Sequence, residues 1–215
     1  MESTFSDKQK IILDVAQQLF ADQGFAGTSV RDIAREADVN IAMISYYFGS
    51  KEKLLEAIFK RHAEVVRLRL ESIIHNAALS PVQKVEHLVD HYIEKYFSKQ
   101  NFHRLIMREQ LSTKESPIAS MLAEMKTQNM NLIKQLIAEG QKKGNFRKNI
   151  DIPLMMATML GTTNQLMTTQ AFYRQVNNLQ SMSDEDFLKH LRKKLSHHLK
   201  SLFKAILTHE AQNTK

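Results

Sequence analysis

Histidines are the first side chains in this sequence that could carry chemistry. His87 and His91 are four residues apart, which would place them on one face of a helix with Asp90 and Glu94 close by. Two histidines at this spacing can contribute to a zinc site. The sequence places no third ligand to complete such a site. We therefore predict no bound metal, and no other pattern calls for a cofactor.

The patterns that usually accompany catalysis are missing from the sequence. The 215 residues include no Cys, which excludes thiol nucleophiles, thiolate zinc sites and disulfides. No pairing of a nucleophile with a base and no glycine-rich phosphate loop can be found. We predict that the protein is not an enzyme.

Flexible apolar side chains are concentrated in the middle of the chain. Eight of the 11 Met lie between residues 107 and 167. Methionine adapts its shape and suits variable binding surfaces, although it also serves as ordinary core packing. An apolar ligand pocket is therefore plausible on composition. The candidate lining residues are Tyr92, Tyr96, Phe102, Met107, Met125 and Phe172.

The net charge of +7 is unevenly distributed. Residues 1–61 contain 8 Lys and Arg against 9 Asp and Glu, whereas residues 62–215 contain 22 against 14. A basic balance points toward nucleic acid as a partner. Recognition of double-stranded DNA needs only a few well-placed cations, so the acidic N-terminal segment does not exclude it.

These residues must be positioned by helices. Only 6 Gly and 3 Pro are present, and residues with high helix propensity are abundant. Apolar residues recur at helical spacing throughout, which predicts an all-α fold. About nine helices are expected, near residues 8–23, 28–36, 41–46, 50–76, 81–97, 101–110, 117–144, 152–174 and 183–209.

The segment from Val30 to Tyr47 has the pattern of a helix-turn-helix. Two helices that cross steeply need a small residue at their contact, and Ala34 occupies that position. Val39 and Ile44 follow at intervals of five residues and would close the core. The turn needs a left-handed residue, usually Gly, and here it is Asp38, which tolerates that conformation better than most residues.

Two stretches carry a family resemblance: TSVRDIAREADV from Thr28 to Val39 and ISYYFGSKEKL from Ile44 to Leu54. Together with the upstream residues Ala16, Leu19, Phe20 and Gly24, they resemble the N-terminal domain of the TetR family of bacterial transcriptional regulators. The resemblance covers about residues 10–58. The rest of the chain is similar to the family in length and helicity.

The resemblance implies a set of DNA contacts. Thr28 would bind a phosphate at a helix N-terminus, Arg31 would point toward the groove, and Lys51 would add a phosphate contact. The start of the recognition helix would lie in the major groove, and two tyrosines would contact the DNA backbone. The residues with these last two roles are Asn40, Ile41, Ala42, Met43, Tyr46 and Tyr47.

The resemblance also implies an architecture and a mode of action. Residues 1–50 would form the DNA-binding domain, and residues 51–215 a ligand-binding and dimerisation domain. The last two long helices would pair two copies, and Gly161 would allow close approach. The homodimer would bind a palindromic operator in double-stranded DNA and act as a repressor that a small apolar or amphipathic inducer releases. The alternative is a DNA-binding regulator without such an inducer, controlled by a protein partner or by its abundance.

The sequence also bears on location. The polar N-terminus does not resemble a signal peptide, and the longest apolar run, near Ile152–Leu160, is shorter than the roughly 20 residues that a membrane span needs. We predict a cytoplasmic protein with no membrane partner.

Overall fold

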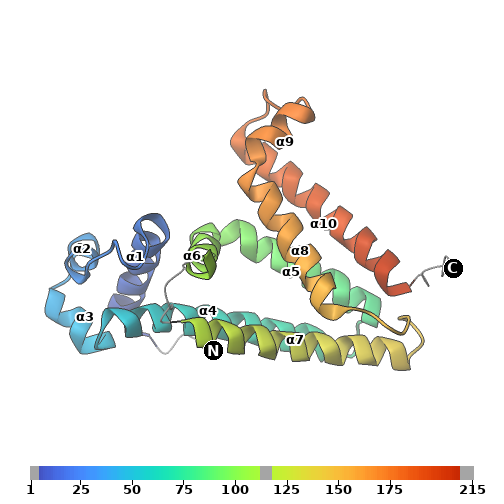
Figure 1. Ribbon diagram of the computed structural model, residues 1–215, viewed down its shortest axis with the longest axis horizontal. Helices are drawn as coiled ribbons and strands as arrows, with labels where there is room; N and C mark the ends of the chain where they lie inside the picture. The colour runs from blue at the N-terminus through green and yellow to red at the C-terminus, as the bar shows by residue number, and fades with distance from the viewer. Residues whose placement is uncertain (1–4, 112–117, 209–215) are drawn as a thin grey trace. The chain divides into compact units, whose positions relative to one another are not determined.

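Ten helices and no strand are found in residues 5–111 and 118–208, which the computed structural model describes (Figure 1). The prediction of an all-α fold is confirmed. The helices are α1 (Asp7–Gln23), α2 (Val30–Glu36), α3 (Ile41–Phe48), α4 (Lys51–Ile74), α5 (Pro81–Ser98), α6 (Gln100–Leu111), α7 (Ala119–Lys142), α8 (Ile152–Thr168), α9 (Gln170–Val176) and α10 (Asp184–Thr208). The helix start predicted at Ser116–Pro117 lies outside the described residues.

Local sequence signals set most of the helix ends. The Ser6 side chain accepts a hydrogen bond from the backbone N–H of Gln9, and the Gln9 side-chain oxygen accepts one from the backbone N–H of Ser6. Asp151 caps α8 in the same manner by accepting from the N–H of Leu154 at 2.9 Å. These side chains satisfy backbone donors that have no partner within the helix.

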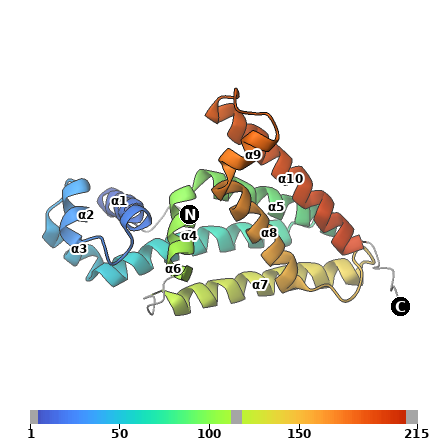
Figure 2. The same cartoon turned by 45° about the horizontal axis from the view of Figure 1, so that its top comes forward.

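The predicted helix over residues 152–174 is divided in two. The backbone of Thr169 adopts φ −116° and ψ 33°, which interrupts the helix between α8 and α9. In Figure 2, α9 turns away from the axis of α8. Arg174 then ties α9 to the start of α10 through a 2.7 Å ion pair with Asp184. The apolar residues keep their helical spacing through Thr169, so the sequence pattern could not reveal the break between the two helices.

The helices belong to two compact units. The first contains α1, α2, α3, α6 and the N-terminal parts of α4 and α7, and the second contains the remainder. The boundaries fall after Arg69 in α4, after Ser98 and after Gln128 in α7. The domain division predicted at residue 50 stays a prediction.

Each unit has its own apolar core. In the first, fully buried side chains from α1, α2, α3 and α4 pack together with Leu105 of α6. In the second, α10 packs along α5 through a stripe of side chains spaced every four residues. That stripe consists of Leu191, Leu195, Leu199, Phe203 and Leu207, all at most 3% exposed.

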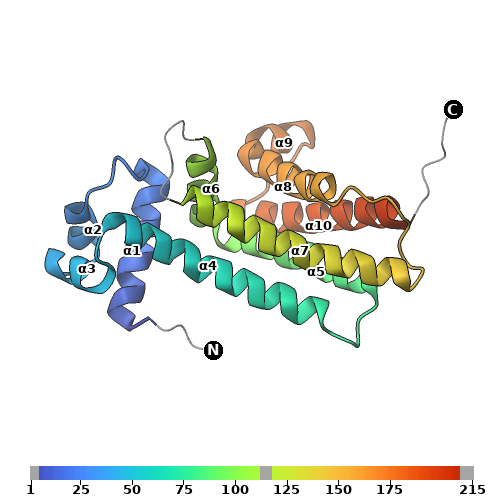
Figure 3. The same ribbon diagram turned by 60° about the horizontal axis from the view of Figure 1, so that its bottom comes forward.

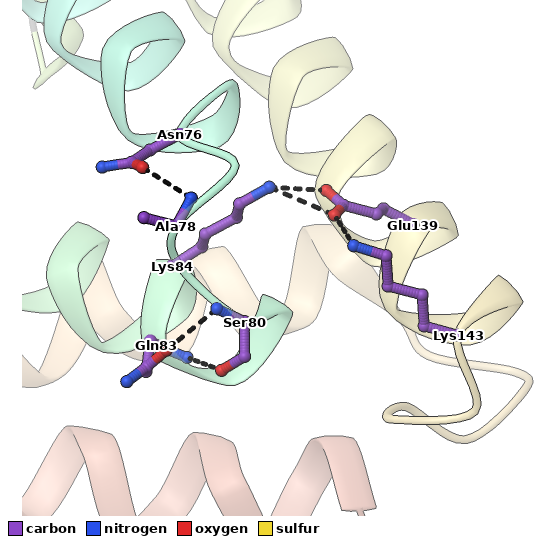
Figure 4. A network of polar contacts seen from close by, with 7 residues as sticks. All are labelled: Asn76, Ala78, Ser80, Gln83, Lys84, Glu139 and Lys143. Carbon is purple, nitrogen blue, oxygen red and sulfur yellow. Dashed lines mark hydrogen bonds and ion pairs between the residues drawn. The ribbon is translucent and has the colours of Figure 1, made fainter.

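A charged network lies inside the second unit, where α5 meets α7 (Figure 4). The Lys84 side chain is only 4% exposed, and its Nζ donates to both carboxylate oxygens of Glu139, at 2.8 and 3.1 Å. Lys143 binds the same carboxylate at 2.7 Å. Hydrogen bonds from Lys143 and Lys84 hold the pKa of Glu139 below its ordinary value. The folded state therefore favours the ionised carboxylate.

Replacement of Glu139 by Gln is expected to lower the free energy of unfolding by about 2 kcal/mol, because it leaves the buried Lys84 without a counterion. Burial of the pair is incomplete, since Glu139 keeps 29% of its side-chain exposure, so the loss should stay below that for a fully buried pair. The carboxylate stabilises the fold above its unfolded pKa, near 4.5, and this contribution disappears as the pH falls through the lower folded pKa. Urea unfolding at pH 7, 5 and 3 should show a shallower acid loss in Glu139→Gln than in the parent. Equal pH dependence in the two proteins would contradict this role.

Candidate DNA-binding site

The helix-turn-helix predicted from the sequence is present in α2 and α3. Ala34 and Ile44 are 6% and 1% exposed, and Val39 packs against the same core. Asp38 adopts φ 50°, the left-handed conformation expected of the turn residue. Two short helices are thus held in a fixed relation by one apolar contact and one turn.

In the loop before α2, the Thr28 side chain points into the protein. The Thr28 side chain is 1% exposed, and its hydroxyl donates inward to the carbonyl of Gly24 at 2.9 Å. The hydroxyl is therefore engaged inside the protein, and the phosphate contact of Thr28 stays a prediction. Ser29 is the N-cap of α2, with reciprocal hydrogen bonds to Asp32. Those hydrogen bonds hold the pKa of Asp32 below its ordinary value.

Lys51 also has a role that the sequence did not indicate. Its Nζ donates to the carbonyls of Phe25 and Thr28 at 2.8 and 2.9 Å and lies 4.3 Å from the centre of the Phe25 ring. The ammonium therefore fastens the first residue of α4 to the loop between α1 and α2. A phosphate contact could use only its remaining donor, and that contact stays a prediction.

The start of α3 presents an apolar surface. Ile41 is 42% exposed, Ala42 is exposed and Met43 is half-buried. Asn40 precedes them as the N-cap, where its amide oxygen accepts from the N–H of Ala42 at 2.9 Å. Arg31 is exposed in the first turn of α2. The structure thus places these five predicted residues on the surface of the helix-turn-helix.

The two tyrosines differ in accessibility. Tyr46 is 84% exposed, whereas Tyr47 is half-buried against the core of the first unit. Their rings meet edge to face with centroids 5.2 Å apart. Tyr46 is the more accessible of the two for a backbone contact. Both contacts remain predictions.

The six candidate ligand residues are not gathered in one unit. Phe102, Met107 and Met125 lie in the first unit, where Phe102 is 6% exposed and stacks on His62 with centroids 3.7 Å apart. The other three, Tyr92, Tyr96 and Phe172, belong to the second unit.

Phe172 is 65% exposed on α9, so it does not line an enclosed pocket within the single chain. Tyr92 and Tyr96 are largely buried, and burial raises the pKa of both phenols above the ordinary value. The Tyr96 hydroxyl donates to Asn164 at 3.0 Å. The ligand-binding role of the six candidate residues stays a prediction.

Helix α6 packs against α1 (Figure 3), and side chains of α6 clamp the end of α1, a contact that the sequence analysis missed. Arg108 donates to the backbone carbonyls of Asp22 and Gln23 at 3.2 and 3.1 Å, and Arg104 pairs with the Asp22 side chain at 2.8 Å. The last turn of α1 contains no basic residue of its own. Cations from α6 therefore compensate the negative end of the α1 dipole. Partners more than 80 residues away leave no local signal in the sequence.

Replacement of Gly24 by Ala is expected to lower the free energy of unfolding by about 3 kcal/mol. Gly24 adopts φ 82° and ψ 163°, a region nearly exclusive to glycine. An added Cβ would also lie 2.7 Å from Nε of Arg108 and displace the clamp. Thermal or urea unfolding would measure the change.

Arg108→Ala provides the control for the two contributions. By itself, this variant should lower the free energy of unfolding by about 1 kcal/mol. When Gly24→Ala is added to Arg108→Ala, only the backbone strain should remain, so the further loss in the free energy of unfolding should be about 2 kcal/mol. An equal loss in both backgrounds would show that Arg108 does not press on Gly24.

Two negative observations apply to the described part of the chain. No group of three or more His, Cys, Asp or Glu is placed to hold a metal ion within it. No helix of residues 5–111 and 118–208 is long and apolar enough to span a membrane.

A helix-turn-helix with an exposed second helix, followed by a larger helical region, defines a DNA-binding regulator. Residues 12–58 match the family model described as bacterial regulatory proteins, tetR family, and residues 81–198 match the model described as tetracyclin repressor-like, C-terminal domain. The chain belongs to the TetR family of transcriptional regulators.

Similar proteins include further regulators. The "Probable HTH-type transcriptional regulator YttP" of Bacillus subtilis is 32% identical over 150 residues, which covers 69% of this chain and 70% of that protein. The fatty acid metabolism regulator protein of the same species is 27% identical over 176 residues, 80% of this chain and 88% of that protein. The crystal structure of FadR from Bacillus subtilis in complex with stearoyl-CoA matches with a TM-score of 0.68 at 21% identity, over 89% of this chain and 97% of that chain. This last likeness supports the fold.

Proposed function

We propose that this TetR-family regulator is a homodimeric repressor that binds a palindromic operator and is released by an amphipathic ligand with a long acyl chain. The exposed start of α3, held by the packed helix-turn-helix, is the observation that carries the DNA-binding assignment. One short recognition helix buries little surface, and two copies related by a two-fold axis can read two half-sites.

The surface of α8 and α9 supports the dimer. No Lys, Arg, Asp or Glu occurs between Ile152 and Ala171. Even so, large apolar side chains on these helices are exposed: Leu154 at 64%, Leu160 at 41%, Phe172 at 65% and Val176 at 56%. Uncharged, apolar exposed surface of this kind marks an interaction site. A second copy of the chain is the proposed occupant.

The proposed ligand class comes from the regulators named above. One relative is a fatty acid metabolism regulator, and the fold matches a structure that contains stearoyl-CoA. A Met-rich central segment and largely buried tyrosines suit an apolar chain with one polar end. The alternative, a regulator without a small-molecule inducer, predicts that no acyl ligand changes the affinity for DNA.

DNA binding is tested by fluorescence anisotropy on the DNA upstream of the protein's own gene, across a salt series. We expect sequence-selective binding that weakens with salt. Arg31→Ala should weaken binding by about tenfold. It should also reduce the slope of the logarithm of the binding constant against the logarithm of the salt concentration, by about 1 for each phosphate that the variant leaves unbound. Lys134→Ala on α7 removes a similar exposed charge in the other unit and should change neither value. Lys51→Ala is a poor probe, because Lys51 also holds the loop before α2.

Release is tested on the same complex with stearoyl-CoA, and with coenzyme A and stearate added separately. Release by stearoyl-CoA alone supports the proposed ligand class. A selective complex that resists all three compounds would favour the alternative without an acyl inducer. Absence of selective binding at low salt, with a folded dimer confirmed, would overturn the assignment as a repressor in the ligand-free state.

A further inference from the structure

The surface that would enter the major groove has an unusual composition. The eight residues of α3 include no charged side chain. With Ile44 and Phe48 turned into the core, the residues at the start of the helix that face solvent are Ile41 and Ala42. In a helix-turn-helix, the first residues of the second helix contact base edges. Here these residues can neither donate nor accept a hydrogen bond through their side chains.

Asn40 does not make up for this lack. Asparagine recognises adenine by donating from its amide nitrogen and accepting with its amide oxygen. The Asn40 oxygen is already engaged with the N–H of Ala42 at 2.9 Å, where it caps α3. The paired contact to adenine would need this same oxygen, so it competes with the cap of the recognition helix.

Among the features displayed in the major groove, the C5-methyl group of thymine is the apolar one. We infer that the start of α3 reads its half-site through thymine methyl groups packed against Ile41 and Ala42, so that each half-site has thymines at the base pairs beneath this turn. This inference rests on the proposed function. It names the chemical feature of DNA that provides specificity there.

The same surface selects against base pairs without thymine. Every base pair presents polar groups at the groove edge, and those packed against Ile41 and Ala42 would lose water without gaining a partner. Only a pair that contains thymine offsets this loss by burying a methyl group. Discrimination would therefore come from methyl burial. Arg31 and Tyr46 are exposed beside this surface and can contact the DNA backbone.

The test begins with selection of binding sites from a random double-stranded DNA library by the full-length protein. Each thymine of the selected site is then replaced in turn by deoxyuridine, which removes only the methyl group. We expect about fourfold weaker binding for each methyl buried against α3, because burial of one such carbon is worth roughly that factor. Thymines outside the base pairs beneath α3 should show no change.

Ile41→Ala supplies the matched variant. The loss of affinity on replacing a thymine by deoxyuridine is the uracil penalty. If the methyl group packs on Ile41, this penalty should be smaller for Ile41→Ala than for the parent at that base pair, since the two changes remove the same interaction. Ile11→Ala removes the same side chain from an exposed position on α1, outside the proposed DNA surface, and should retain the full penalty. Circular dichroism and thermal unfolding of both variants check that they keep the helix content and stability of the parent.

Two results would count against the inference in different ways. Selective binding without any uracil effect would overturn the methyl readout and leave the proposed function standing. Failure to select any site, with a folded protein, would overturn both. A uracil effect that is undiminished in Ile41→Ala would show that Ile41 does not pack on the methyl group.

Discussion

Replacement of Gly140 by Ala should destabilise the protein by about 3 kcal/mol, although Gly→Ala in a helix usually stabilises by about 1 kcal/mol. Gly140 lies in α7, and the buried ring of Phe146 folds back over it. A Cβ at this position would lie 2.0 Å from Cδ2 of Phe146. The ring cannot retreat cheaply, since Asn145 and Phe146 both donate their N–H groups to the carbonyl of Gly140, at 2.8 and 3.1 Å.

The sign of the effect should reverse when the ring is removed. In a Phe146→Ala background, the added methyl group meets no ring, and Gly140→Ala should stabilise by about 1 kcal/mol through helix propensity alone. Phe146→Ala by itself is expected to cost about 3 kcal/mol, as for other large-to-small changes in cores. Chemical unfolding of the parent, the two single variants and the double variant gives the four free energies of unfolding that this double-mutant cycle compares. A stabilising Gly140→Ala in the parent protein would contradict the close packing of the ring.

Predictions based on local patterns succeeded where the physical cause is itself local. The left-handed turn at Asp38 and the small contact residue Ala34 each follow from one or two neighbouring residues. The all-α fold follows from apolar spacing of the same kind. The first residues of the recognition helix face outward, as their position within the motif implies, and their contacts with DNA stay a prediction.

The sequence patterns did not reveal contacts that depend on residues outside the local motif. Thr28 and Lys51 resemble phosphate ligands in the sequence, and no pattern indicated the inward hydrogen bonds that both also make to the loop between α1 and α2. Arg108 and Lys84 find their partners on other helices. Lys84 does leave one faint signal: it stands four residues before Leu88 on the apolar face of α5, where a charge requires a counterion. The signal does not say that the counterion is Glu139.

The proposed dimer leads to the prediction with the largest effect on function. Gly161 is exposed on α8, and a Cβ added there would meet nothing within 4 Å. Replacement by Arg is therefore expected to leave the isolated chain folded, with stability equal to that of the parent or slightly higher because Gly is a poor helix former. In the dimer, the same side chain would be forced into an uncharged contact between two copies of α8. Burial of an unpaired cation there should drive the protein to monomers.

Loss of the dimer should weaken operator binding by about 100-fold or more, because the two half-sites would then be bound independently. Sedimentation and anisotropy would measure the two effects on the same sample. Ala138→Arg on α7 adds the same charge at another exposed helical position of the second unit, and it should remain dimeric with full affinity. A dimeric Gly161→Arg would exclude α8 from the interface. A folded monomer with undiminished affinity would show instead that the dimer is not needed to bind the operator, and that a single helix-turn-helix suffices.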